Sequence, residues 1–238
     1  MSYLNQLNAL AQLWGSDKGD SNRSDRLQAL RYMDYYSEYF ARHFARLEKV
    51  KSILEIGTNT GASLRIWAEF FPEARVHGID VTRKYEVAER LDHPRISTHI
   101  VHPGDASLYL GAIRFNEYLG NPGFDIIIDD GSHDQYDQQD ALGFLFPYLK
   151  SGGLYVVEDI ITGEEWWDGR LYNRNKIRPT RDLLRQLEGL DAPADGKLGM
   201  SEEQLQYVID NAEYFNYKEA PAIIYERHHP QIAFIGKK

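Results

Sequence analysis

The sequence of 238 residues contains no cysteine. This absence excludes disulfide bonds, thiolate metal sites and cysteine nucleophiles, and it leaves the redox compartment open. Basic residues are also in deficit, because 27 Lys and Arg stand against 36 Asp and Glu, for a formal net charge of −9. Proteins bind phosphate backbones through net basic surfaces, so we expect no nucleic acid partner and favour a small or neutral substrate.

Long hydrophobic runs are missing as well. No apolar segment approaches the roughly 20 residues that cross a bilayer, and the N-terminus has neither a basic segment ahead of an apolar one nor a small-residue cleavage site. We therefore expect no membrane partner and a soluble, cytoplasmic protein. With 42% hydrophobic and 26% charged residues, the chain can bury a full core, and we expect one domain over residues 1–238.

Short apolar, β-branched segments alternate with segments of helical length through the middle of the sequence. Several of these segments are too apolar to leave one face in water. The pattern predicts an α/β fold with a doubly wound, mostly parallel sheet covered by helices on both sides. The expected strands are residues 51–57, 74–80, 95–101, 124–130 and 152–159, with helices expected after Gly61 and over 134–150.

Further elements are expected on both sides of this core. Apolar residues at helical spacing over 24–48 predict one or two N-terminal helices, whose tyrosines we interpret as a packing stripe. After the fifth strand, an irregular insertion contains a short helix at about 180–189. A capping box at 201–204 opens another helix. Residues 221–226 and 231–237 predict an antiparallel hairpin at the sheet edge.

These elements divide the single domain into four parts. We expect an N-terminal helical segment (1–50), a cofactor-binding core (51–160), an insertion with a helix (161–220) and a C-terminal hairpin (221–238).

The first expected strand runs into a glycine loop that opens a helix, where α/β sheets bind nucleotide-like ligands. Bare amides and glycines at such a loop let a ligand approach the backbone. A dinucleotide fingerprint reads Gly-x-Gly-x-x-Gly, but here Asn59 stands between Gly57 and Gly61 and the second glycine is missing. We therefore expect no pyrophosphate cradle of that type.

Three acidic residues follow the first three strands in register. Glu55 lies inside a buried strand and needs a cationic or hydrogen-bonding partner. Asp80 is placed to bind both hydroxyls of a ribose, and Asp105 lies where an adenine would be. An adenosine with a cationic amino-acid tail is S-adenosylmethionine. The cofactor residues that we predict are Glu55, Gly57, Thr58, Gly61, Ser63, Asp80, Asp105 and Asp129.

Four carboxylates end the fourth and fifth expected strands: Asp129 and Asp130 on one, Glu158 and Asp159 on the other. Neighbouring parallel strands present their carboxyl ends at the same edge, so we expect the four to converge. Like charges a few Å apart either share protons or bind a cation. Oxygen ligands favour Mg²⁺ before Ca²⁺ or Mn²⁺. Alternatively, Asp129 faces the cofactor, and the other three form the ligand set.

His133 follows the fourth strand after a Gly-Ser turn, in which Ser132 is the expected N-cap of the next helix. Histidine is the side chain best matched to accepting a proton near neutral pH, and a positioned general base contributes about 10²–10⁴ in rate. A histidine in a loop is otherwise a surface or capping residue, which is our interpretation of most histidines in this chain. Beside three expected metal ligands, we predict that His133 is a general base.

Taken together, these motifs resemble the metal-dependent sugar O-methyltransferases of antibiotic biosynthesis, of the macrocin, mycinamicin and rhamnosyl type. The resemblance runs from about residue 13 to 160, and its most specific part is DDGSH followed by VED. The glycine loop alone would indicate only a class I, Rossmann-like methyltransferase. The motifs that carry the resemblance are ILEIGTNTGAS, VHGID, FDIIIDDGSH, LKSGGLYVVED and the N-terminal GSDKG.

The resemblance implies a role for each matching residue. The Mg²⁺ ligands would be Asp130, Glu158 and Asp159, and His133 would be the general base. Glu55, Gly57, Asp80 and Asp105 would hold S-adenosylmethionine. It further implies an enzyme that methylates a deoxysugar or rhamnosyl hydroxyl of a glycoside, and a homo-oligomer, either a dimer or a tetramer.

Several alternatives stay open at this point. A catechol-type O-methyltransferase would use the same cofactor and cation on a different acceptor, and a non-catalytic adenosine-binding module would lack turnover altogether. Trp166, Trp167 and Tyr136 either stack on the acceptor or form a small core of the insertion. Asp17 and Lys18 either fold over the site or belong to a turn that links two helices.

Overall fold

The computed structural model describes residues 2–20, 30–83, 85–101, 109–160, 176–192, 194–219 and 231–238. Seven strands of the described residues form one sheet in the order β3-β2-β1-β4-β5-β7-β6. The first five strands are parallel, and β7 and β6 are antiparallel additions at one edge. The expected doubly wound, mostly parallel α/β sheet is thus confirmed.

The five parallel strands lie where the sequence predicts them. Their bounds are β1 (Ser52–Ile56), β2 (Arg75–Asp80), β3 (Ile96–Ile100), β4 (Phe124–Asp129) and β5 (Leu149–Val157). The consecutive residues Ile126, Ile127 and Ile128 of β4 are all fully buried, because a central parallel strand packs against helices on both faces.

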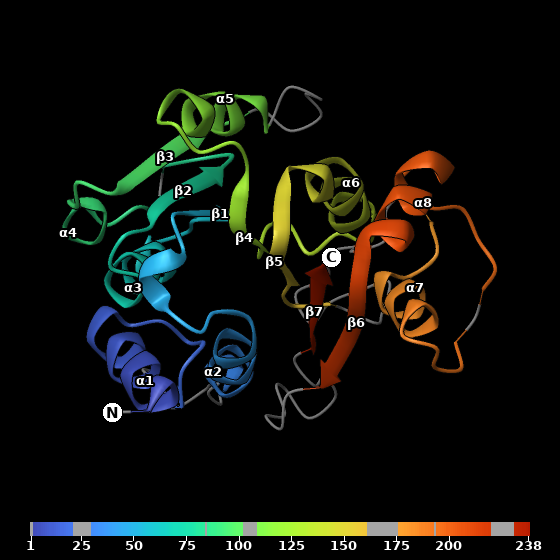
Figure 1. Cartoon of the computed structure of the whole chain (residues 1–238), viewed down its shortest axis with the longest axis horizontal. Helices are drawn as coiled ribbons and strands as arrows, with labels where there is room; N and C mark the ends of the chain where they lie inside the picture. The colour runs from blue at the N-terminus through green and yellow to red at the C-terminus, as the bar shows by residue number, and fades with distance from the viewer. Residues whose placement is uncertain are drawn as a thin grey trace.

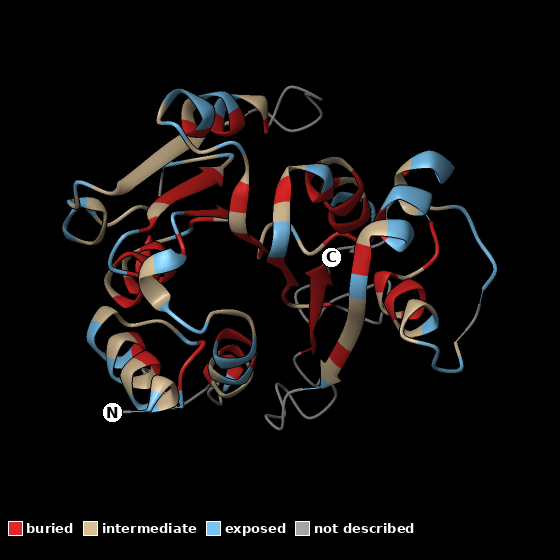
Figure 2. Ribbon diagram, viewed as in Figure 1, coloured by how far each residue is buried: buried red, intermediate tan, exposed pale blue. Residues whose placement is uncertain are grey.

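Two layers of helices enclose the sheet (Figure 1). One face carries α1 (Tyr3–Trp14), α2 (Tyr32–His43) and α3 (Ala62–Phe70). The other carries α5 (Leu110–Tyr118), α6 (Gln135–Leu145), α7 (Thr180–Leu187) and α8 (Glu202–Asn211). The short helix α4 (Ala88–Leu91) and the 3-10 turns η1 (Leu47–Lys49) and η2 (Phe146–Tyr148) complete the described elements. Figure 2 shows the buried residues concentrated in the sheet and on the helix sides that face it.

The expected helices α7 and α8 are present, and Ser201 and Gln204 form the predicted capping box at the start of α8. Of the N-terminal helices, α2 falls inside the predicted segment 24–48, whereas residues 21–29 lie outside the described residues. The helix α1 lies within the expected N-terminal helical segment 1–50, although the sequence analysis gave it no bounds of its own. No helix in the described part of the chain is both long and apolar enough to span a bilayer.

The antiparallel pair at the sheet edge is confirmed, but its first strand lies elsewhere. β6 (Ala212–Glu219) pairs with β7 (Gln231–Lys237), whereas the sequence analysis placed the first strand at 221–226, which lies outside the described residues. β6 is the outermost strand, and most of its residues are only partly buried. An edge strand of this kind has no run of apolar residues, so the sequence pattern did not reveal it.

A buried histidine in the sheet makes stability depend on pH. His77 of β2 is fully buried, and the centroid of its ring lies 6.0 Å from that of His99 on β3. Phe115 and Phe124 pack edge-on against the His77 ring. Burial, together with the charges of His99 and Arg75, lowers the pKa of His77 from 6.5 to about 4.

We therefore expect the protein to lose stability as the pH falls from 6.5 toward 4. Below pH 6.5, His77 binds a proton in the unfolded chain but not in the folded protein. The contribution of His77 to the free energy of unfolding is therefore complete above that pH and declines below it. The full shift corresponds to about 3 kcal/mol. Urea unfolding gives the free energy of unfolding at neutral pH and near pH 4. Between these two conditions it should decline less for His77→Phe than for the wild type. Equal declines would contradict this assignment.

Candidate active site

The carboxyl ends of β1, β4 and β5 lie at one edge of the sheet, and the backbone ladder continues past the strands. Asp130 N donates to Ile56 O at 3.0 Å, and Glu158 N donates to Asp129 O at 2.8 Å. The acidic residues that follow β4 and β5 therefore reach the same edge, as expected for neighbouring parallel strands.

Asp130, His133 and Asp159 form a cluster at this edge. One potential ligand atom from each residue lies within 4.8 Å of the others. His133 Nε2 is 3.3 Å from Asp130 Oδ1 and 3.7 Å from Asp159 Oδ2. The structure thus brings together the predicted general base and two of the three predicted metal ligands.

Two members of the cluster have a left-handed backbone. The φ angle is 59° at His133 and 48° at Asp159. Residues other than glycine adopt this region at a cost of order 1 kcal/mol or more, and such residues gather at functional sites. The expected cap is corrected here: Asp134, not Ser132, is the N-cap of α6, because its side chain accepts from Tyr136 N.

The third predicted ligand, Glu158, is held by one group from α2 and one from the segment between α1 and α2. Its Oε2 accepts a hydrogen bond from Lys18 Nζ at 2.5 Å, and its Oε1 accepts one from Tyr36 OH at 2.5 Å. Lys18 Nζ also donates to Asp130 Oδ2 at 2.5 Å. Lys18 and Glu158 are both buried, so an internal ammonium group compensates carboxylates that are otherwise costly to bury.

Both interpretations of the Lys18 segment apply. The segment links two helices, because α1 ends at Gly15 in the left-handed region, and Met33 N of α2 donates to Lys18 O. It also reaches the site through the Lys18 side chain, and Asp17 is exposed although its carboxyl lies near the charges of Asp130 and Asp159.

Proton affinities in the cluster follow from this geometry. Burial alone would lower the pKa of His133, but the hydrogen bond to Asp130 and the charge of Asp159 outweigh it and raise the pKa to about 9. Burial opposes the charge of Lys18 too, yet Asp130 and Glu158 raise its pKa well above the usual value. The neighbouring carboxylates therefore favour the protonated forms of His133 and Lys18.

Two further buried carboxylates lie next to the cluster, at the ends of β1 and β4. Glu55 Oε2 accepts from Trp67 Nε1 at 3.0 Å, and Asp129 Oδ1 accepts from Gly131 N at 3.2 Å. Among the described residues, no group donates to Glu55 Oε1 or Asp129 Oδ2. Burial raises the pKa of each carboxyl to about 7. Buried carboxylates with an open oxygen suit a cationic ligand.

The glycine loop is tied to the end of β2. Asp80 Oδ2 accepts from Thr58 N at 2.9 Å and from Asn59 N at 3.0 Å, and the Thr58 hydroxyl donates to it as well. Asp80 Oδ1 accepts from Thr82 N. A ribose hydroxyl at Asp80 would therefore share a carboxylate that already holds the loop.

The structure requires glycine at two positions of this loop for reasons other than ligand access. Gly57 has φ of 84°, and a Cβ there would lie 2.0 Å from Asp130 O, so glycine lets the loops after β1 and β4 touch. Gly61 is the N-cap of α3 with φ of 80°. Ser63 is buried in the first turn of that helix.

Some predicted residues lie outside the described residues or apart from the cluster. Asp105, Trp166 and Trp167 belong to the undescribed segments. Asp129 is not part of the Asp130-His133-Asp159 cluster. Tyr136 is 38% exposed at the start of α6, so it is available to a ligand but packs little.

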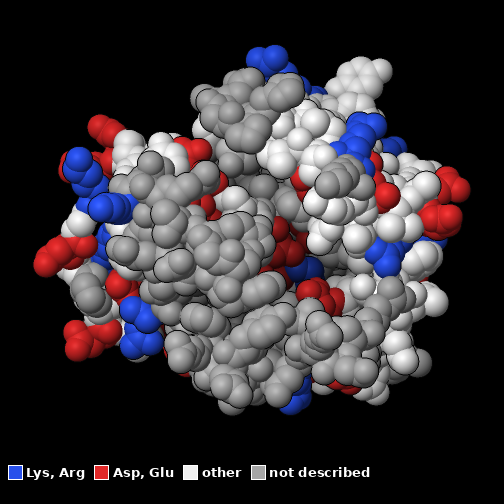
Figure 3. Space-filling model, turned by 180° about the vertical axis from the view of Figure 1, so that it is seen from behind, with Lys and Arg blue, Asp and Glu red and all other residues white. Residues whose placement is uncertain are grey.

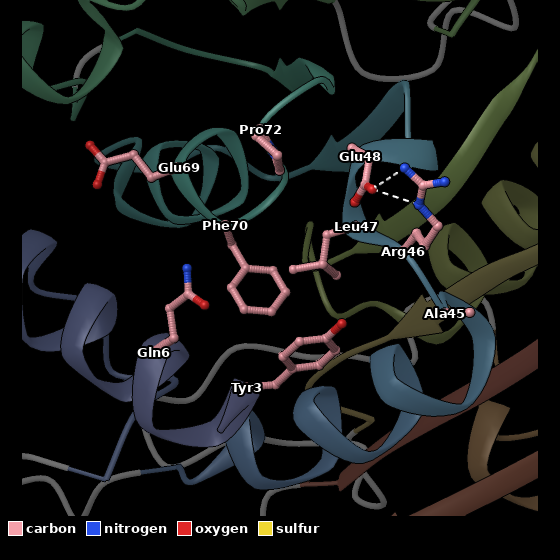
Figure 4. Close-up of a pocket in the computed structure, with 9 residues that line it drawn as sticks. All are labelled: Tyr3, Gln6, Ala45, Arg46, Leu47, Glu48, Glu69, Phe70 and Pro72. Atoms are coloured by element: carbon pink, nitrogen blue, oxygen red, sulfur yellow. Dashed lines mark hydrogen bonds and ion pairs between the residues drawn. The ribbon is translucent and has the colours of Figure 1, made fainter. Parts of the chain in front are cut away.

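Charged side chains of both signs meet in a central hollow on the face turned away from Figure 1 (Figure 3). A separate hollow of about 420 Å³ lies between α1, α3 and the segment that precedes β1 (Figure 4). Its lining residues are Tyr3, Gln6, Ala45, Arg46, Leu47, Glu48, Glu69, Phe70 and Pro72. None of the predicted site residues lines it, so we do not assign the chemistry to it.

The sequence analysis missed two residues that contact the acids. Tyr32 OH donates to Asp159 Oδ1 at 2.6 Å, and Tyr36 OH donates to Glu158. Both tyrosines are fully buried, so the predicted packing role is real but incomplete. Their spacing of four residues predicts a common helix face, whereas nothing in the sequence pointed to their acidic partners.

Comparisons with known proteins show which proteins this chain is similar to. Residues 54–160 match the family model of a methyltransferase domain. The chain also aligns with MycE, a methyltransferase from the mycinamycin biosynthetic pathway solved in complex with Mg, SAH and Mycinamycin VI, with a TM-score of 0.62 and 24% identity over 98% of this chain and 53% of that one. Residues 54–160 thus resemble a methyltransferase domain, and the chain has the class I methyltransferase fold.

Two curated relatives are sugar O-methyltransferases. The 8-demethyl-8-(2-methoxy-alpha-L-rhamnosyl)-tetracenomycin-C 3'-O-methyltransferase of Streptomyces olivaceus is 34% identical over 78% of this chain and 48% of its own length. The Mycinamicin VI 2''-O-methyltransferase of Micromonospora griseorubida is 35% identical over 58% of this chain and 34% of its own length. The resemblance to sugar O-methyltransferases of antibiotic pathways is confirmed, although the chain spans half of these relatives or less.

We expect Lys18→Met to destabilise the metal-free protein by about 3–5 kcal/mol, because it leaves Asp130 and Glu158 buried without their cation. The matched control is Lys51→Met, since Lys51 pairs with Glu73 on the surface at 3.5 Å and such pairs contribute less than about 1 kcal/mol. Urea unfolding in EDTA measures both. Similar losses for the two variants would show that Lys18 does not compensate the buried acids.

Proposed function

We propose that this chain is an S-adenosylmethionine- and Mg²⁺-dependent O-methyltransferase that acts on a sugar hydroxyl of a glycosylated natural product. The observation that carries the proposal is the Asp130-His133-Asp159 cluster at the carboxyl edge of a methyltransferase domain. Support comes from the relatives, which are named as O-methyltransferases of rhamnosyl tetracenomycin and mycinamicin compounds, and from MycE, which was solved with Mg and SAH.

The described residues would suit both groups. Asp130 and Asp159 would hold the ion, which when bound supplies a Lewis acid that lowers the pKa of a sugar hydroxyl. Glu158, the third predicted ligand, would join them only by giving up its hydrogen bond from Lys18 or Tyr36. Oxygen ligands of this kind suit Mg²⁺. Glu55 and Asp129, each with an open buried oxygen, would hold the cofactor together with Asp80, and the cofactor supplies an electrophilic methyl group.

His133 has the position of a general base. Its Nε2 faces the same carboxylate oxygens that would bind the ion, so an acceptor hydroxyl in the cluster would lie within reach of it. The negative charges of Asp130 and Asp159 raise the pKa of His133 to about 9. Compensation of those charges by a cation would lower this pKa toward neutrality, where an imidazole accepts a proton. The other residues of the site would contribute by positioning the acceptor, and positioning can lower the activation free energy by about 7–11 kcal/mol.

His133→Ala should lower turnover at least 100-fold, because the hydroxyl proton has no acceptor. The affinity for S-adenosylhomocysteine, measured by calorimetry, should be unchanged. The control is His93→Ala, a histidine between α4 and β3 whose Nδ1 accepts from Arg95 N and which is not part of the Asp130-His133-Asp159 cluster. An unchanged turnover in His133→Ala would refute its role as a base.

Activity should be lost in EDTA and return with millimolar Mg²⁺ in the wild type, whereas Asp159→Asn should stay inactive at the same Mg²⁺ concentration. The reason is that the amide cannot supply the anionic oxygen that a hard ion prefers. The transfer of a labelled methyl group from S-adenosylmethionine measures the activity under each condition. Full activity of the wild type in EDTA would refute the metal requirement.

Acceptor profiling separates the sugar from the catechol alternative. A panel of rhamnosyl and olivosyl glycosides should be methylated in preference to aromatic diols. A chain that binds S-adenosylhomocysteine but methylates neither class would be an adenosine-binding module. The expected dimer or tetramer remains a prediction.

A further inference from the structure

α2 brings two buried phenol hydroxyls to the end of β5. Tyr32 OH lies 2.6 Å from Asp159 Oδ1, and Tyr36 OH lies 2.5 Å from Glu158 Oε1. Residues four apart lie on the same helix face, so both hydroxyls point to the same side of α2. This helix precedes residues 54–160, the segment that matches the methyltransferase domain.

The backbone of Asp159 explains how two consecutive carboxylates reach one helix. In a strand, successive side chains point to opposite faces. Asp159 follows the end of β5 and has a φ of 48°, so the alternation stops there and its side chain turns to the face that Glu158 already occupies. This conformation is unfavourable for a residue other than glycine, and the hydrogen bond from Tyr32 helps to hold it.

Each aspartate of the cluster has one oxygen held by the protein and the other turned to His133. Asp159 Oδ1 accepts from Tyr32, and its Oδ2 lies 3.7 Å from His133 Nε2. Asp130 Oδ2 accepts from Lys18, and its Oδ1 lies 3.3 Å from the same nitrogen. Outer groups that orient ligands in this way typically contribute 10–100-fold, roughly, to metal affinity.

We propose that Tyr32 is a positioning residue of the metal site, whose hydroxyl holds Asp159 so that Oδ2 faces the bound ion. This inference rests on the proposed function, because it requires a divalent ion between Asp130 and Asp159. It also makes α2 a structural part of the metal site.

The test compares Tyr32→Phe with Tyr39→Phe in the full chain. Tyr39 is buried on the same helix, its ring stacks on Phe234 with centroids 3.9 Å apart, and its hydroxyl donates to Asn216 Oδ1 at 2.9 Å. Each substitution removes one hydroxyl and keeps the ring. A general loss of packing would therefore affect both variants, whereas only Tyr32 touches a carboxylate of the cluster.

Mn²⁺ binding, followed by electron paramagnetic resonance without cofactor or acceptor, gives the affinity directly. We expect Tyr32→Phe to weaken binding by about 10–100-fold and Tyr39→Phe to leave it nearly unchanged. Circular dichroism confirms that both variants are folded.

Three results would overturn the inference. Wild-type affinity in Tyr32→Phe would overturn it and leave the proposed function intact, as would equal weakening in both variants. A wild-type protein that binds no Mn²⁺ at millimolar concentration would overturn the metal site itself and this inference with it.

Discussion

The buried ammonium group of Lys18 is the interaction on which the site depends. Two neighbouring strands of this sheet end in acids, and a poorly solvated edge cannot hold their charges without compensation. Lys18 Nζ donates to Asp130 and Glu158 at 2.5 Å each. Since it extends from the turn between α1 and α2, the acids at the end of the sheet are compensated only when both N-terminal helices are docked.

The helix α2 contacts both the aromatic core and the acids at the end of the sheet. The ring of Tyr36 lies 4.9 Å from that of Trp67, and Trp67 Nε1 donates to Glu55. The hydroxyl of Tyr36 meanwhile donates to Glu158. One aromatic cluster thus contacts both Glu55 and Glu158, two acids of the candidate active site. The N-terminal helices therefore belong to this candidate site, although the methyltransferase domain match begins only at residue 54.

Local patterns explain which parts of the fold were predictable. β4 and the second half of β5 are nearly continuous apolar runs, and α3 has apolar residues at helical spacing, so each could be recognised without its neighbours. The bounds of α1 were not predicted, although Ser2 and Gly15 cap this helix in the usual way. The edge strand β6 has a polar, partly buried surface, and its pairing with β7 depends on residues that are distant in sequence.

By itself, the sequence determined that acids follow neighbouring parallel strands and that His133 lies close behind one of them, so their meeting at one edge follows from topology alone. Only the tertiary structure decided which oxygens face the cluster, that Glu158 is bound by Lys18 and Tyr36, and that Gly57 accommodates the backbone of Asp130. The reason is separation along the chain: Lys18 lies 112 residues from Asp130 and 140 from Glu158, and no local pattern relates side chains that meet only when the helices dock.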